Sequence, residues 1–472
     1  MSQPDLSLQD FGLLNPAWAA TPAAVTASDA AFAQAMLDVE AAWARVQADA
    51  GLASARDAEA ITAIARVELY DLSLLASRGP DGANALIPLV GMMRAQLVSS
   101  GAPASASVVL HRGATSQDII DTALQLMASR TRTTILTDLR LAGTALAALA
   151  SAHANTPAVA RSLTQHALPT TFGLRTANWL AGLTDAARRL ESLALPLQWG
   201  GAVGTLASLK QKLRETMPEA PGIELDETIN RLSAALATEL VLSNPVAPWH
   251  TNRTPVMELS ATLASVIATL GVMGSDVLTA SRPEIGEVSE PREEGKGGSS
   301  AMPQKQNPVH SVLLRNAALA APAHLSSIFI AAGTAVDERP DGGWHVEWAA
   351  LRELMRLAGG AASHGATLAT GLVVHPQALA KNMALSGDLL VSEKISSVLA
   401  PLLSGGKTEV QAIIRSSLST GEELRPLLRA AIPASDFSDA QLASLLDPSE
   451  YLGTTRNLIT RICADFSAWK ES

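Results

Sequence analysis

The sequence predicts an all-α fold, and three features of its composition indicate this. Alanine and leucine, both strong helix formers, dominate the 472 residues. Aromatic residues make up only 3%, although sheet-rich proteins usually contain more of them. Charged residues make up only 17%, which indicates that much helix surface is buried, in part between subunits. A chain of this length exceeds one simple core, so we expect two or three domains.

Helical patterns begin after an amino-terminal arm. Residues 1–27 hold three prolines and no clear period, so we expect them to be extended. Apolar residues then recur at steps of four and three, which places one face of a helix between a cap at Ser28 and a stop at Gly51. The residues of this face are Phe32, Met36, Val39, Trp43 and Val46. Further helices are expected over 57–77 and 84–99.

Long helices are expected in the middle of the chain, over 116–153, 170–194, 255–281, 309–333 and 346–372. The segment 255–281 is apolar over most of its circumference, so we interpret it as a helix buried in an oligomer core. A smaller helical domain is expected to follow towards the carboxyl terminus.

A segment over 283–308 interrupts this pattern with four glycines, four prolines and eight charged residues. A loop of this length is uncommon in a compact domain, so it is either a plain linker or a loop kept for its chemistry. Its glycines let backbone N–H groups approach an anion, and Lys305 and Asn307 add a charge and an amide. In such surroundings Ser299, paired with Ser300, could act as a base.

Three other polar segments allow both a structural and a functional interpretation. In HRGATSQDIIDT, Thr115 and Asp118 resemble a capping box, but Thr115 and Ser116 could also offer donors to a carboxylate, with His111 nearby. In RSLTQHALPTTFG, Gln165 and a histidine precede an expected helix start. The third segment, DERPDGGWHVEW at 337–348, is an ordinary surface turn in the simpler interpretation.

Several classes of protein are disfavoured by the sequence. The net charge of -10 argues against a nucleic-acid partner. The single cysteine, Cys463, excludes an intramolecular disulfide framework and fits a reducing cytosol. We expect no signal peptide, no membrane span and a cytoplasmic location. Neither HExxH nor CxxC occurs, and no Walker A or GxGxxG motif is present, so we expect no metal and no cofactor.

The segment GSSAMPQKQNP at 298–308 matches every fixed position of GSSxMPxKxNP, the signature of the fumarase/aspartase superfamily. Within that superfamily the chain most resembles the bacterial 3-carboxy-cis,cis-muconate cycloisomerases. HRGATSQDIIDT, QHALPTTFGLR and GGWHVEW look like segments of that family and occur in the same order.

The resemblance implies a three-domain helical protomer, with a bundle of long central helices that packs into a homotetramer. The expected domains are 1–112, 113–355 with the catalytic loop 283–308, and 356–472. In such proteins segments of three subunits assemble each active site around a small polycarboxylate. The implied reaction is reversible addition or elimination beside a carboxylate, through an aci-carboxylate that preorganised donors stabilise. For this family it closes 3-carboxymuconate to a lactone.

By its position in the signature, Ser299 would be the base. The resemblance also implies a set of residues that bind substrate: His111, Thr115, Ser116, Gln165, Ser300, Met302, Lys305 and Asn307. Several positions depart from relatives. His166 stands where a glutamine is expected, and the amino-terminal arm lacks an expected arginine before its first helix. Leu163 stands where the adenylosuccinate lyase branch has a histidine, thought to be the general acid, and Gln306 stands where an arginine is common in cycloisomerases. A lyase that releases fumarate from a substituted succinate, and a catalytically silent scaffold, remain alternatives.

Overall fold

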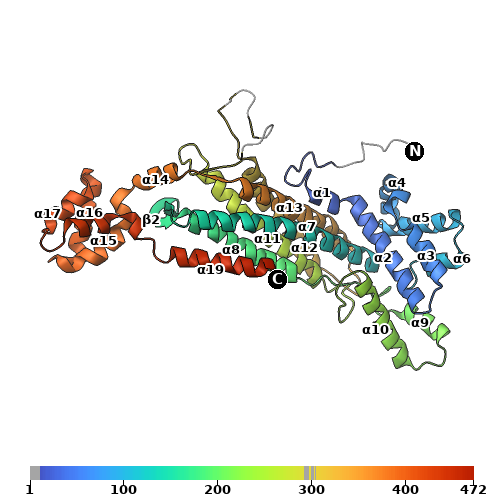
Figure 1. Ribbon diagram of the computed structural model, residues 1–472. Helices are drawn as coiled ribbons and strands as arrows, with labels where there is room; N and C mark the ends of the chain where they lie inside the picture. The colour runs from blue at the N-terminus through green and yellow to red at the C-terminus, as the bar shows by residue number, and fades with distance from the viewer. Residues whose placement is uncertain (1–10, 292–296, 299–301, 303, 472) are drawn as a thin grey trace. The chain divides into compact units, whose positions relative to one another are not determined.

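The structure is a computed structural model that describes residues 11–291, 297–298, 302 and 304–471. Most of the described chain is helical, which confirms the predicted all-α class (Figure 1). The chain groups into two compact units. Unit 1 comprises 1–138, 186–268 and 316–363, and unit 2 comprises 139–185, 269–315 and 364–472. The predicted division into three domains stays a prediction.

Helices α1–α6 and α9–α10 belong to unit 1. Their bounds are α1 (Pro22–Thr26), α2 (Asp29–Asp49), α3 (Ala55–Ile64), α4 (Leu72–Arg78), α5 (Leu86–Ser99), α6 (Ala104–Val109), α9 (Ala207–Thr216) and α10 (Gly222–Glu239). Five long helices contribute residues to both units: α7 (Ser116–Ala152), α8 (Phe172–Ser192), α11 (Thr254–Ala280), α12 (Val309–Gly333) and α13 (Gly342–Gly371). These long helices agree with the predicted ranges to within a few residues.

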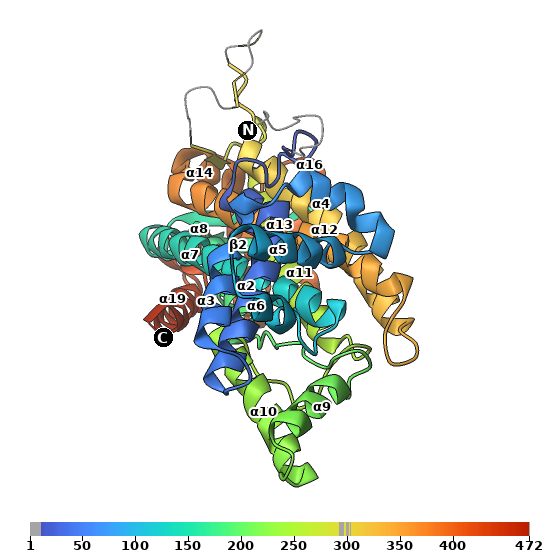
Figure 2. The ribbon, with the colours of Figure 1, turned by 90° about the vertical axis from the view of Figure 1, so that its right-hand side faces the viewer.

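In unit 1, α2 packs against α3 and α10. The Ser28 side chain accepts a hydrogen bond from Ala31 N and so caps this helix as predicted. On the predicted apolar face, Phe32 is half-buried and the other members are buried. The hairpin of α9 and α10, whose helices lie side by side in both views, joins α2 through an ion pair of Arg45 and Glu239 (Figure 2).

Two predictions for unit 1 are wrong in detail. The expected helix over 57–77 is broken, because α3 ends at Ile64 and Asp71 then caps α4 by accepting from Leu74 N. The amino-terminal arm is not simply extended either. From residue 11 it folds through turns into α1, and buried Trp18 stacks on Arg356, with 4.4 Å from the ring centroid to the guanidinium carbon.

Unit 2 contains the two small sheets found in the described residues. Strands β1 (Pro157–Ser162) and β2 (Gln165–Thr171) form an antiparallel hairpin, and β3 (Val288–Ser289) pairs with β4 (Val373–Val374). Gln165 does precede a helix as predicted, but it lies in a strand that was not predicted and that continues to Thr171, directly before α8 begins at Phe172. Leu163 and Thr164 form the turn with φ of 50° and 71°, and this left-handed pair is typical of a two-residue hairpin loop.

A buried carboxylate anchors this hairpin. Glu287 accepts hydrogen bonds from Arg161 at 2.6 Å, Arg175 at 2.8 Å and Asn382 at 2.9 Å. Burial raises the pKa of Glu287, but the hydrogen bonds from these three side chains outweigh burial and hold the pKa below its usual value. The start of the 283–308 segment is thereby tied to β1 and α8.

The carboxyl-terminal part of unit 2 consists mainly of short helices. It contains α14 (Pro376–Ala384), α15 (Ser392–Leu399), α16 (Gly406–Thr420), α17 (Leu424–Ala431) and α18 (Asp439–Leu446), followed by α19 (Thr455–Glu471). Helices α15 to α18 pack around one apolar core that includes Ile395, Val410 and Leu428, and the first three of them lie together in Figure 1.

Three helices, α7, α11 and α12, are long and apolar enough to cross a membrane by length and composition alone. Half of the most apolar window of α11 is buried, but only 22% of that of α12. Large apolar side chains of α12, such as Leu319 and Ile330, are correspondingly exposed. A single protomer therefore leaves apolar helix surface uncovered.

Candidate active site

The amino end of α7 is one of the two places in the described chain where predicted site residues gather. Thr115 precedes the helix and Ser116 begins it, and both are half-buried. The predicted capping box is only half formed. Thr115 N donates to the Asp118 carboxylate at 3.0 Å, but the Thr115 hydroxyl oxygen accepts from Arg339 at 2.8 Å. The N–H of Thr115 is therefore engaged, while its hydroxyl hydrogen remains available to a ligand.

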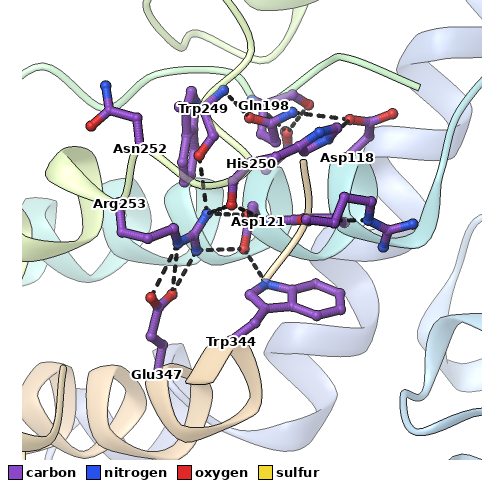
Figure 3. Close-up of polar contacts among 12 residues, drawn as sticks. Asp118, Asp121, Gln198, Trp249, His250, Asn252, Arg253, Trp344 and Glu347 are labelled. Atoms are coloured by element: carbon purple, nitrogen blue, oxygen red, sulfur yellow. Dashed lines mark hydrogen bonds and ion pairs between the residues drawn. The ribbon is translucent and has the colours of Figure 1, made fainter. Parts of the chain in front are cut away.

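Asp118 is fully buried and accepts hydrogen bonds from five donors. They are Thr115 N, Gln198 Nε2, Gly200 N, Gly201 N and His250 Nε2, at 2.8–3.1 Å. This carboxylate ties the first turn of α7 to the glycine-rich bend that follows residue 198 (Figure 3). A side chain could not replace the hydrogen of Gly200, since an added Cβ would lie 2.8 Å from Pro248 and 2.9 Å from His250.

Arg339 is the cation of this region. Its guanidinium bonds only to neutral oxygens, Thr115 Oγ1 at 2.8 Å and Gln117 Oε1 at 3.3 Å, and lies 6.0 Å from the Trp344 ring centroid. It forms no ion pair with a carboxylate of the described residues. Residues 337–341 form a bend before α13, as in the simpler interpretation, and Arg339 within this bend also contacts the amino end of α7. An arginine with neutral partners at a helix amino terminus is suited to hold an anion.

Beneath this surface lies a fully paired ionic cluster, shown in Figure 3. Arg253 forms ion pairs with Asp121 at 2.7 Å and Glu347 at 2.6 Å, and Trp344 Nε1 donates to Asp121 at 2.9 Å. Burial lowers the pKa of the Arg253 guanidinium, but the two carboxylates more than reverse this. Because each of these buried charged groups is hydrogen-bonded within the cluster, we assign the cluster a structural role: it joins α7, the residue before α11, and α13.

His111 lies in a strained conformation beside this region, with φ of 59°. Both its backbone N and its Nδ1 contact the Glu40 carboxylate, at 3.0 and 2.7 Å. Burial lowers the pKa of His111, but the hydrogen bond and charge of Glu40 outweigh it and raise the pKa overall. A left-handed backbone conformation is strained in a residue other than glycine, and such strain is common at functional sites. The geometry is therefore consistent with the predicted role of His111 in binding substrate.

The remaining predicted site residues belong to unit 2. Gln165 is exposed, and its Nε2 donates to the neighbouring Thr164 Oγ1 at 3.2 Å. Met302 and Lys305 are exposed and Asn307 is half-buried. Asn307 N donates to Gly297 O at 2.8 Å, which closes the base of the signature segment. Among the described residues no hydrogen bond links Gln165 to Met302, Lys305 or Asn307. The predicted base Ser299, with Ser300, lies outside the described residues.

No group of three metal-ligating side chains occurs among the residues that the structure describes.

Comparison with known proteins identifies the family. A family model described as Lyase matches residues 19–322. The chain belongs to the fumarase/aspartase superfamily of lyases. It is therefore an enzyme of that superfamily, and the hypothesis of a silent scaffold is set aside.

Two relatives and one solved structure are especially similar. Nitrosuccinate lyase of Streptomyces davaonensis is 42% identical, with 96% of this chain and 94% of that protein covered. 3-Carboxy-cis,cis-muconate cycloisomerase of Pseudomonas aeruginosa is 38% identical, with 95% of each covered. The structure of 3-carboxy-cis,cis-muconate lactonizing enzyme from Pseudomonas putida superposes with a TM-score of 0.86 at 33% identity, covering 97% of this chain and 99% of that one. The predicted resemblance to cycloisomerases is confirmed.

Proposed function

We propose that this enzyme closes 3-carboxy-cis,cis-muconate to 4-carboxymuconolactone, by reversible addition and elimination beside a carboxylate. Cycloisomerases of this name are among its relatives, and a solved lactonizing enzyme shares its fold over nearly the whole chain. These similarities support the choice of substrate, and the hairpin tip described next disfavours elimination of an amine.

The observation that carries the proposal is the tip of the β1–β2 hairpin. Leu163 occupies it, with 93% of the residue exposed, at the position where the adenylosuccinate lyase branch has its histidine. An apolar side chain cannot deliver a proton to a leaving group. An amine departs poorly without a proton, whereas a carboxylate departs as a stable anion. Leu163 therefore disfavours amine elimination and is compatible with opening and closing of a lactone.

In the direction of elimination, Ser299 takes a proton from the carbon next to a carboxylate, and the electron pair enters that carboxylate. The C–O bond at the neighbouring carbon then breaks, and its electrons leave with the departing carboxylate. In the direction of lactone formation the same steps run in reverse, so Ser299 returns the proton to carbon. Lys305 and Asn307 hold the substrate carboxylates in this proposal, and Ser300, Met302 and Gln165 contact the substrate.

Thr115, Ser116 and Arg339 form what we call the carboxylate subsite. Arg339 is charged and bonded only to neutral oxygens, the Thr115 hydroxyl hydrogen is available, and the α7 dipole favours an anion at this end. His111 extends the same surface. We propose that one carboxylate of the substrate binds here.

Elimination of nitrite from nitrosuccinate is the second candidate. The 42% identity to nitrosuccinate lyase favours it. Gln306, which is neutral, stands where cycloisomerases commonly have an arginine, and a substrate with fewer carboxylates needs fewer cations. Nitrite is also a stable anion, so Leu163 is equally compatible with this reaction.

We further propose a cytoplasmic homotetramer that uses no cofactor. The exposed apolar side chains of α12 would be covered by other copies of the chain rather than by lipid, since elsewhere α12 carries polar residues such as Arg315 and Asn316.

The experiment that tests the function supplies 3-carboxy-cis,cis-muconate, nitrosuccinate and a succinyl amine conjugate, each separately, to the purified enzyme. Loss of muconate absorbance with formation of the lactone supports the cycloisomerase, and formation of fumarate with nitrite supports the second candidate. Turnover of a succinyl amine conjugate, with neither of the other two, would contradict the role given to Leu163.

A further inference from the structure

His250 has a tautomer that its surroundings determine. Its Nε2 lies 3.1 Å from Asp118 Oδ1, and every other contact of that carboxylate is with an N–H donor. The carboxylate therefore acts as an acceptor towards the ring as well. In the neutral imidazole the hydrogen is then on Nε2, and Nδ1 carries the lone pair.

Nδ1 of His250 has no hydrogen-bond partner among the described residues, although only 4% of the residue is exposed. The ring edge faces the glycine-rich bend, where an added Cβ at Gly204 would lie 3.9 Å from Nδ1. A buried acceptor without a donor is unfavourable. The contact of Nε2 with Asp118 is therefore the one hydrogen bond of this ring among the described residues.

The backbone of His250 makes a second connection. Its carbonyl oxygen accepts from Gln117 Nε2 at 2.8 Å and from Arg253 Nη1 at 3.4 Å. Gln117 uses its other amide atom, Oε1, to accept from Arg339. Figure 3 shows the histidine between Asp118 and the Arg253 cluster.

Two routes therefore run from His250 to the carboxylate subsite. In the first route the His250 ring donates to the Asp118 carboxylate, which also accepts from the backbone N–H of Thr115. In the second route the His250 carbonyl accepts from Gln117, whose side-chain oxygen accepts from Arg339. We propose that His250 is a positioning residue for this subsite: the Nε2–H tautomer orients Thr115 through Asp118 and so sets the affinity for a substrate carboxylate. His250 itself does not touch the substrate. The proposal rests on the proposed function only for the location of the subsite.

A matched pair of variants tests this. In His250→Gln the terminal amide nitrogen reaches about as far as Nε2, so the bond to Asp118 is retained. In His250→Asn the amide reaches only as far as Nδ1, so that bond is lost. We use propane-1,2,3-tricarboxylate, a non-reactive probe, and measure its affinity by calorimetry. H250N should bind about tenfold or more weakly, and H250Q within about threefold of the wild type, as expected for loss or retention of a hydrogen bond to a charged group.

Equal affinities in the two variants, whether normal or reduced, would overturn the proposal, and so would absence of probe binding to the wild type. Thermal unfolding of each variant shows whether a loss of affinity results from loss of the folded structure. Should H250N fail to fold, the ¹⁵N spectrum of the histidine-labelled wild type decides, with the His250 signal assigned by its loss in H250Q. We expect a protonated Nε2 and a bare Nδ1, and the opposite tautomer would be incompatible. Because the probe does not react, failure of the turnover assays leaves this test valid.

Discussion

Replacement of Arg339 by glutamine tests the carboxylate subsite. The guanidinium donates to Thr115 Oγ1 and Gln117 Oε1, which are both neutral. No carboxylate of the described chain therefore neutralises its charge. A hydrogen bond to a charged group contributes about 1.5–3 kcal/mol. Since about 1.4 kcal/mol corresponds to a factor of ten, Arg339→Gln should lower kcat/KM by about 10- to 150-fold. Because both ground and transition states carry this carboxylate, most of the loss should appear in KM.

The assay is initial-rate kinetics on whichever of the two proposed substrates turns over, with thermal unfolding in parallel. Arg339→Lys keeps the charge but not the planar fork, so it should recover part of the loss. Arg352→Gln is the control, because Arg352 pairs with the exposed Asp29 at the surface and should leave kcat/KM unchanged. A folded R339Q enzyme with kcat/KM within about twofold of the wild type would refute the assignment of Arg339.

Three further predictions concern the supports of the site. Gly200→Ala should destabilise the chain by about 1–3 kcal/mol through overcrowding, whereas Gly222→Ala, with no atom near the added Cβ, should be close to neutral in thermal unfolding. Glu287→Gln should cost about 3 kcal/mol in urea unfolding near pH 7. Because the folded chain lowers the pKa of Glu287 below 4.5, the gap to the wild type should close as the pH falls below about 4.5, and a constant gap would contradict this. The folded chain raises the pKa of His111 above 6.5 through Glu40. The contribution of this pair to the stability of the folded chain is therefore fully present below pH 6.5 and is lost as the pH rises above that value. The difference in stability between the wild type and Glu40→Gln should shrink as the pH rises.

The long helices could be predicted from sequence because their signals are local and repeated. Residues 116–153 form a long helical run, residues 255–281 are apolar over most of the circumference of a helix, and the structure places helices over both segments. The break at Asp71 was missed, since one capping residue inside an apolar run is a weak signal beside the run itself. The hairpin was missed because Gln165 to Thr171 is short and ends in Pro-Thr-Thr, which also reads as a helix start.

The site was predictable only where a motif is long. The segment at 298–308 led to the superfamily through consecutive residues, and the family match confirms it. The pairing of Arg339 with Thr115 joins residues 224 positions apart, and no local pattern encodes it. Neither does the sequence show that Asp118 would take the N–H of Thr115 and leave the hydroxyl to Arg339.

The most direct test of the central claim, that a serine of the signature segment moves the proton at carbon, is the rate of Ser299→Ala. General acid–base catalysis contributes about 10²- to 10⁴-fold, so kcat should fall by at least about a hundredfold. Binding of propane-1,2,3-tricarboxylate and the oligomeric state should remain those of the wild type. A variant that retains more than about a tenth of the wild-type kcat would show that another group carries the proton.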